Sequence, residues 1–236
     1  MSIKAVLFDL DATLLPMDQN EFIEEYFKSL SAKMAIHGYE PKKLMEAMWS
    51  GIKAMIASTG EKTNEQSFWD AFKMVFGDKA LEDIEIHKDY YENDFDTLKS
   101  VCGYTPKSNE IVKYLKKKGI MVILATNPLY PLIATEKRIG WAGLDKNDFE
   151  LITTYENSHY CKPNPDYYKE ILEKLNLKPK ECVMVGNDAQ EDMIAEKIGI
   201  KVFLLTDNLL NSKNLDISKY PQGSFEKLYN FLEKAI

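Results

Sequence analysis

The chain has 236 residues, of which 45% are hydrophobic and 28% charged, so it can bury one large core or a core with a smaller insert. A formal net charge of −7 offers no positive field for nucleic acid or an anionic membrane, and we expect neither as a partner. The three cysteines, Cys102, Cys161 and Cys182, lack CxxC spacing, which favours a reducing, cytoplasmic location over a disulfide framework or a zinc site.

The first predicted element is a short strand, AVLF, over Ala5–Phe8. Its apolar residues are continuous rather than alternating, which is typical of a strand buried on both faces. Lys4 and Asp9 flank the run, so we do not expect a secretory signal, and no apolar run approaches the length of a membrane span. Two carboxylates, Asp9 and Asp11, follow this strand within three residues, which marks its end as a candidate site.

From about Met17 to about Val101 the sequence shows only helical periodicity. Glycine and polar residues divide this segment into about four predicted helices, over residues 20–38, 40–58, 64–77 and 80–98. We therefore predict a helical cap domain over residues 17–100, inserted into a core domain formed by residues 1–16 and 101–236.

Aromatic and methionine residues form stripes along these predicted helices, and they include Trp49, Phe68, Trp69 and Phe72. Such stripes are more often packed interior than ligand site, and we interpret them as interior. The two linkers of the segment contain proline and glycine, which predicts a hinge between cap and core.

Four further apolar runs follow, each interpreted as a buried strand: Met121–Thr126, Glu150–Thr154, Cys182–Gly186 and Lys201–Thr206. Helical patterns precede or separate them, over residues 108–119, 164–176 and 191–199. This alternation predicts an α/β fold with a Rossmann-like, doubly wound parallel sheet and helices on both faces.

Ligands of such sheets bind at the carboxyl ends of the strands, so the residues there are the candidate site. They carry carboxylate, hydroxyl, amide or ammonium groups: Asp9, Asp11, Thr13, Thr126, Asn127, Lys162, Asn187, Asp188 and Asp192. Clustered carboxylates raise each other's pKa and stay ionised only near a cation. Oxygen ligands without His or Cys select a hard metal, so we predict Mg²⁺ as cofactor and a phosphate group as ligand.

These residues resemble the four motifs of the haloacid dehalogenase superfamily of phosphohydrolases, in the family's order and at strand ends. The DxDxT motif reads DLDAT over residues 9–13, with Ala12 where the family usually has glycine. The other three motifs are represented by Thr126 in ILATN, Lys162 in KPNP, and Asp188 with Asp192 in VGNDAQED, where Asn187 stands before the first aspartate. The helical insert corresponds to the family's cap, of the C1 type. The resemblance therefore implies that Ala12 adopts a backbone conformation that glycine adopts more easily.

The resemblance implies roles for the first two carboxylates. Asp9 would be the nucleophile that attacks phosphorus and forms an aspartyl phosphate. Asp11 would protonate the leaving alkoxide and then deprotonate the hydrolytic water. Family members that cleave carbon–halogen or carbon–phosphorus bonds usually lack the second aspartate, so its presence here favours phosphate esters.

The resemblance also implies how metal and phosphate are held. Mg²⁺ would be bound by the Asp9 side chain, the Asp11 main-chain carbonyl and Asp188, with Asn187 left open as an alternative ligand from the same turn. The phosphate would be bound by Thr126, Asn127 and Lys162, of which Lys162 also takes part in catalysis. Asp192 and Asn187 would not contact the phosphate directly. Asp192 would orient Lys162 or a metal-bound water, and Asn187 would lie close by.

The predicted function is a Mg²⁺-dependent phosphatase for a small phosphorylated metabolite, and two alternatives stay open. A phosphomutase of the β-phosphoglucomutase type must also grip a second phosphate, for which arginine is well suited. The single arginine, Arg138, lies outside the predicted cap, which disfavours this alternative. A non-catalytic binding protein on the same fold is the other alternative, although no catalytic residue is missing. The substrate and the oligomeric state stay open.

Overall fold

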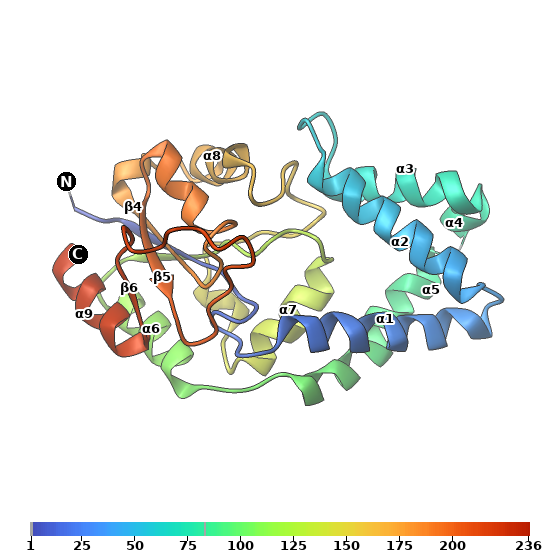
Figure 1. The fold of residues 1–236 in the computed structure, drawn as a ribbon, viewed down its shortest axis with the longest axis horizontal. Helices are drawn as coiled ribbons and strands as arrows, with labels where there is room; N and C mark the ends of the chain where they lie inside the picture. Colours follow the sequence, from blue (N-terminus) through green and yellow to red (C-terminus); the bar gives the residue numbers. More distant parts are fainter. Residues whose placement is uncertain (1, 83) are drawn as a thin grey trace.

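A parallel six-stranded sheet and a helical lobe lie side by side in the computed structural model, which describes residues 2–82 and 84–236 (Figure 1). Both ends of the chain lie at the side of the sheet that faces away from the lobe. Among these residues no helix combines the length and apolar character needed to cross a bilayer.

The sheet has the order β3-β2-β1-β4-β5-β6, and every neighbouring pair is parallel. Its strands are β1 (Ala5–Phe8), β2 (Met121–Leu124), β3 (Leu151–Ile152), β4 (Cys182–Gly186), β5 (Lys201–Leu205) and β6 (Gln222–Gly223). β1 lies between β2 and β4, with Ala5 opposite both Met121 and Cys182. All four β1 residues are buried, as a continuous apolar run predicts. The sequence prediction missed β6, which has only two residues.

Helices cover both faces of the sheet, so the fold is the doubly wound α/β arrangement that the sequence predicts. One face, which includes Val6 and Phe8, packs in one buried cluster with residues of α6 (Pro106–Lys117) and α9 (Phe225–Ala235). The other face packs with α8 (Pro165–Lys174) and the 3₁₀ helix η5 (Met193–Ile198). The remaining helical elements of the core are α7 (Leu132–Trp141), η3 (Lys146–Asp148) and η4 (Pro179–Glu181).

The segment between β1 and β2 is helical, with no strand among its described residues, 19–82 and 84–101. It begins with α1 (Gln19–Ile36), α2 (Pro41–Ile56) and α3 (Asn64–Phe76), close to the predicted bounds. Within the predicted fourth helix the structure describes α4 (Lys79–Glu82) and α5 (Ile84–Asp89), and from Tyr90 the α-helix is replaced by the π-helical η1 (Tyr90–Asp94) and the 3₁₀ helix η2 (Phe95–Val101).

The π-helical turn has a packing reason. Tyr90 and Phe95 are five residues apart, and the Phe95 N–H donates to the Tyr90 carbonyl across the turn. Both rings pack edge-on against Tyr26 of α1, with centroids 6.1 and 6.2 Å away. A regular α-helix would not place residues five apart on one face, so the sequence periodicity alone did not indicate this break.

The two segments that join the helical lobe to the sheet run side by side. Met17 and Cys102 form an antiparallel bridge, and the Gly103 N–H donates to the Pro16 carbonyl at 2.6 Å. A β-carbon on Gly103 would lie 3.1 Å from the ring of Pro16, so the close approach favours glycine. We propose that these paired linkers separate a core domain of residues 1–16 and 101–236 from a cap domain of residues 17–100.

Candidate active site

The loop after β1 holds the first group of candidate residues in a tight turn. The N–H groups of Thr13 and Leu15 both donate to the Leu10 carbonyl, at 3.1 and 2.8 Å. Asp9 is buried at 7% exposure, and the Thr13 hydroxyl lies 3.1 Å from its Oδ2. The same hydroxyl lies 3.0 Å from Oδ1 of Asn187, so it joins the ends of β1 and β4.

Ala12 adopts a left-handed backbone conformation, with φ of 59°. An L-residue there is strained because its β-carbon crowds the backbone, whereas glycine is not. We therefore expect Ala12→Gly to raise the free energy of unfolding by about 0.5–1 kcal/mol, measured by urea denaturation. Ala134→Gly is the matched control: Ala134 is buried within α7, and this change should lower stability by about 1 kcal/mol. Equal destabilisation by both changes would contradict the assignment of strain to Ala12.

Lys162 is buried in the loop after β3, at 1% exposure, and reaches back to the end of β1. Its Nζ donates to Asp9 Oδ1 at 2.9 Å and to Asp192 Oδ1 at 2.6 Å. Its main-chain N–H donates to Asn127 Oδ1 at 3.2 Å, and the Asn127 amide also donates to Glu191 Oε2 at 3.0 Å. Asn127 therefore braces the lysine loop, and the ammonium group is held between two carboxylates.

Thr126 lies two residues after the end of β2, which is paired with the end of β1 that precedes Asp9. The Ala125 N–H donates to the Phe8 carbonyl at 2.7 Å, so these strand ends are in register. The Thr126 carbonyl accepts from the hydroxyls of Thr153 and Tyr167. These two hydrogen bonds hold the Thr126 backbone in place next to the loop that carries Asp9.

The turn after β4 brings three more predicted residues to the same edge. Asp188 Oδ1 accepts the N–H groups of Gln190 and Glu191, while its Oδ2 takes no part in these bonds. Asp192 is 1% exposed, and its Oδ2 accepts the Asp188 N–H at 2.9 Å. This turn also explains why the predicted helix over 191–199 becomes the shorter η5: residues 188–192 are held in a tight capped turn.

Asn187 has a bracing position. Its Oδ1 faces the Thr13 hydroxyl, and its Nδ2 donates to the Asn208 carbonyl at 2.8 Å. Both ends of the amide are engaged with protein groups, in contrast to the neighbouring Asp188. The predicted site residues therefore all lie at one edge of the sheet, although they come from four separate segments of the chain.

Negative charge exceeds positive charge at this edge. Burial raises the pKa of Asp192 to about 7, with a further increase from Asp9 and an opposing effect of Lys162. Burial also raises the pKa of Glu191 to about 8, again against the effect of Lys162 and with contributions from Asp192 and Asp188. A buried lysine among this many carboxylates does not neutralise them, and a bound cation would lower both pKa values.

The donor set fits a hard, partly hydrated cation. No cluster of three or more His, Cys, Asp or Glu side chains arranged to hold a metal ion occurs within residues 2–82 and 84–236. The predicted set needs only two carboxylates, Asp9 and Asp188, together with the Asp11 carbonyl. Water completes the coordination of Mg²⁺ in most such sites, so a set of this size is sufficient.

Sequence reasoning missed Arg138, which the structure places against Asp11. Its guanidinium is fully buried and donates from Nη1 to Asp11 Oδ2. Two bonds within α7 fix it, from Nε to the Ala134 carbonyl and from Nη2 to the Thr135 hydroxyl. The Tyr130 ring covers its flat face, with the guanidinium carbon 4.4 Å from the ring centroid. One feature of the sequence could have indicated this burial: Arg138 lies four residues after Ala134, on the same side of α7 as the helix's apolar residues.

Asp11 is left with one unused oxygen. Its Oδ1 is buried and has no hydrogen-bond partner among the described residues. Burial raises the pKa of Asp11 above its usual value, although Arg138 opposes this shift. A carboxyl with a free buried oxygen and a raised pKa is suited to carry a proton toward a ligand.

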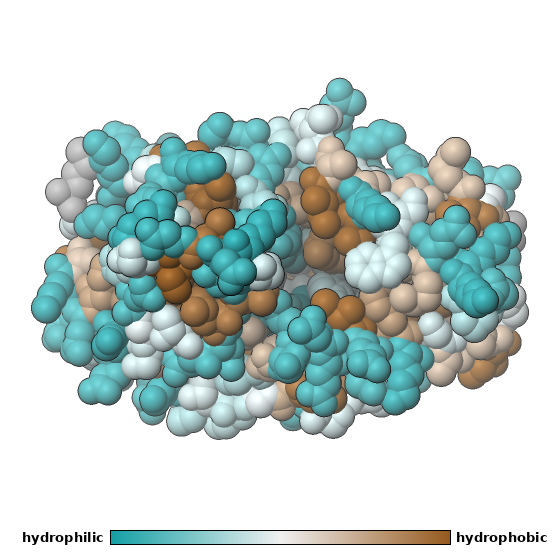
Figure 2. Space-filling model, viewed as in Figure 1, coloured by the Kyte–Doolittle hydropathy of each residue, from teal (hydrophilic) through white to brown (hydrophobic). Residues whose placement is uncertain are grey.

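A cavity of about 550 Å³ lies between the helical lobe and two loops of the core. Figure 2 shows a hollow between these two parts, with hydrophobic residues along its sides. Trp49, Phe68 and Trp69 line the cavity, whereas Phe72 is fully buried. The interpretation of the aromatic stripes as packed interior is therefore only partly right: α2 and α3 pack together along one side and present other aromatic residues to the cavity.

Comparison with known proteins identifies relatives of the whole chain. The model of the haloacid dehalogenase-like hydrolase family matches residues 6–205. The pyrophosphatase PpaX of Bacillus cereus is 26% identical over 232 residues, which cover 98% of this chain and 96% of the relative.

Solved structures share the fold. A predicted phosphoglycolate phosphatase from Haemophilus somnus is 19% identical, covers 98% of both chains and has a TM-score of 0.59. The HAD-hydrolase YfnB from Bacillus subtilis, described as bound to magnesium with interdomain movement, is 16% identical with a TM-score of 0.57. The aligned region covers 98% of this chain and 99% of the YfnB chain.

Proposed function

The chain belongs to the haloacid dehalogenase-like hydrolase family, and on that premise we propose that it is a Mg²⁺-dependent phosphatase of a small phosphorylated metabolite. The observation that carries this proposal is the pair Asp9 and Asp11, each held by its own buried cation. Lys162 binds Asp9, and Arg138 binds Asp11. The two carboxylates are thereby given different surroundings, which suits two different chemical roles.

In the first half-reaction, a carboxylate oxygen of Asp9 attacks phosphorus and the bond between phosphorus and the ester oxygen breaks. Asp11 gives its proton to the departing alkoxide, so the alcohol leaves neutral. In the second, Asp11 takes a proton from water as the water attacks the aspartyl phosphate, and Asp9 is regenerated with release of inorganic phosphate. Each acid or base step of this kind contributes about 10²- to 10⁴-fold.

The phosphoryl oxygens need cationic and hydrogen-bonding partners. We infer that Lys162 supplies positive charge and that Thr126 supplies a hydroxyl, since both lie beside Asp9. Asn127 acts on phosphate indirectly, because its amide is already used to brace Lys162 and Glu191. Asp192 orients the lysine ammonium, and Asn187 orients Thr13.

Mg²⁺ would be bound by the Asp9 carboxylate, the Asp11 carbonyl and Asp188, where it would neutralise charge on the phosphoryl group. The relative YfnB, described as bound to magnesium, supports this choice of metal. The free Oδ2 of Asp188, beside the fully engaged amide of Asn187, favours Asp188 as the ligand from this turn.

Phosphate release from p-nitrophenyl phosphate is therefore expected to require added Mg²⁺ and to stop in excess EDTA. Asp188→Asn should raise the Mg²⁺ concentration for half-maximal rate by about tenfold or more, because it weakens a ligand. Asp207→Asn is the control, an exposed aspartate after β5 that should leave this concentration unchanged. Full turnover in EDTA would reject the metal-dependent mechanism.

The structure gives no support to the phosphomutase alternative. Such an enzyme must bind a second phosphate while the first is transferred, and a bidentate arginine is suited to that. Arg138, the single arginine of the chain, is buried against Asp11 and Tyr130 and is not free to do so.

A further inference from the structure

The cavity between helical lobe and core opens over the same edge of the sheet as the proposed catalytic residues. Its core side is formed by Leu129–Ile133, which follow Thr126 and Asn127, and by Tyr155 and Glu156, which follow β3. Tyr130 is shared between the two sites, because its ring lines the cavity and also covers the guanidinium that binds Asp11. The cavity is therefore in position to receive the part of a substrate that leaves with the ester oxygen.

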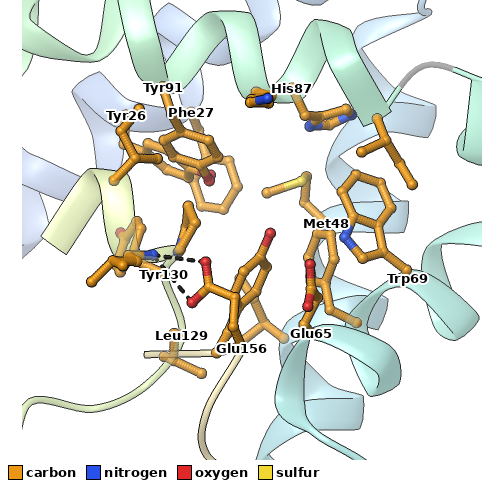
Figure 3. Close-up of a pocket in the computed structure, with 18 of the residues that line it drawn as sticks. Tyr26, Phe27, Met48, Glu65, Trp69, His87, Tyr91, Leu129, Tyr130 and Glu156 are labelled. Carbon is orange, nitrogen blue, oxygen red and sulfur yellow. Dashed lines mark hydrogen bonds between the residues drawn. The ribbon is translucent and has the colours of Figure 1, made fainter. Parts of the chain in front are cut away.

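Aromatic rings form much of the cavity wall. They come from both the helical lobe and the core and include Tyr26, Phe27, Trp49, Trp69, Tyr91 and Tyr130. Figure 3 shows Tyr26, Phe27 and Tyr91 on one side of the space and Trp69 on another, so rings face the cavity from different directions. The faces of aromatic rings carry partial negative charge, and several of them around one space attract an organic cation.

Two carboxylates reach into this aromatic space. In Figure 3 the side chains of Glu65 and Glu156 rise from the same side of the cavity, with Glu65 below Met48 and the Glu156 carboxylate turned to its hydrogen-bond donor. Both oxygens of Glu156 accept the Leu132 N–H, at 2.8 and 3.1 Å, which fixes the group without neutralising it. Burial and the nearby Glu156 raise the pKa of Glu65 above its usual value. A cation bound between them would stabilise both carboxylates.

Lysine and arginine are scarce in the part of the cavity wall that the structure describes. Lys88 is the one lysine or arginine among the described residues that line the cavity; it is exposed, 3.9 Å from Glu85. His87 also lines the cavity, but it is buried, with its ring packed edge-on against Trp69. An anionic leaving group would thus meet the carboxylates of Glu65 and Glu156 and the ring faces, which repel it, while Glu136 of the same lining is paired with Lys146.

We propose that this cavity binds an alkylammonium group, so that the substrate is a phosphate monoester of an amino alcohol with a quaternary or alkylated nitrogen. This inference rests on the proposed phosphatase function. It separates the chain from relatives whose names specify pyrophosphate or phosphoglycolate, since both of those substrates carry negative charge beyond the transferred phosphoryl group.

The test compares esters that differ in the charge of the leaving group. With Mg²⁺, the purified protein should hydrolyse choline phosphate with a kcat/KM about tenfold or more above that for 3,3-dimethylbutyl phosphate, its neutral isostere. Phosphoglycolate and pyrophosphate should be poorer than either. Equal or better hydrolysis of the neutral or anionic compounds would overturn the inference while leaving the phosphatase function intact. No phosphate release from any ester, p-nitrophenyl phosphate included, would instead reject the proposed function.

Variants of the two carboxylates test the site itself. Glu65→Gln and Glu156→Gln should each reduce the preference for choline phosphate over its neutral isostere. The exposed Glu46→Gln on α2 is the matched control and should leave the preference unchanged. An unchanged preference in both cavity variants would overturn the assignment of Glu65 and Glu156.

Binding can be measured without turnover. Tetramethylammonium should perturb the fluorescence of Trp49 and Trp69, which line the cavity, and the effect should saturate. Glu65→Gln should weaken this binding severalfold, and Glu46→Gln should not. Absence of saturable binding to the wild-type protein would count against the cavity as a cation site even if the protein proves to be a phosphatase.

Discussion

Asp9→Asn is expected to abolish phosphate release and covalent labelling together. An amide attacks phosphorus poorly, and it also loses the charge that pairs with Lys162 at 2.9 Å. The measurement is phosphate release from p-nitrophenyl phosphate with Mg²⁺, together with mass spectrometry of acid-quenched protein. Turnover near the original rate would show that Asp9 is not the nucleophile.

Asp11→Asn is expected to separate the two half-reactions. With an alkyl phosphate, both should slow by about 10²-fold or more, because the proton donor and base are gone while the main-chain carbonyl remains. With an aryl phosphate the leaving group needs little protonation, so the aspartyl phosphate should form faster than it is hydrolysed. A phosphorylated species labelled on Asp9 should therefore accumulate. A label on any other residue would mean that the two acids have been assigned the wrong roles.

Arg138→Met is expected to have the largest effect on stability. The change leaves Asp11 without its buried partner, and breaking a buried ion pair from one side typically costs about 3–5 kcal/mol. Urea denaturation measures this loss. Lys146→Met is the matched control: it removes an exposed ion pair with Glu136, which is worth at most about 1 kcal/mol. Similar losses in both variants would contradict a special role for the buried pair.

The pH profile tests whether Arg138 acts through Asp11. Arg138 lowers the pKa of Asp11 against the stronger effect of burial, so its removal should raise that pKa further. The limb of the kcat/KM profile that reports the pKa of Asp11 should therefore shift to higher pH in Arg138→Met. It should shift less in Arg138→Lys, which keeps a positive charge and is the variant more able to fold. A purely structural role for Arg138 would lower stability without moving the limb.

The sequence by itself determined five of the six strands of the sheet and the residues at their ends. Continuous apolar runs gave β1 and β4 with their observed bounds, because a strand covered on both faces has no polar side to interrupt the pattern. Parallel strands end at one edge, so Asp9, Lys162 and Asp188 could be assigned to one site from their positions alone. Helical periodicity, divided by glycine and polar residues, similarly indicated the first three helices of the lobe.

Other features depended on contacts between distant parts of the chain. The π-helical turn in the predicted fourth helix follows from the packing of Tyr90 and Phe95 on Tyr26, and β6 forms only because β5 provides its partner. The pairing of Arg138 with Asp11 joins residues 127 positions apart. Likewise, Trp49 and Trp69 line a cavity rather than the packed interior, since loops of the core face them. Periodicity reports which side of an element is apolar, but only the tertiary structure decides whether a side chain, another helix or an open cavity lies against that side.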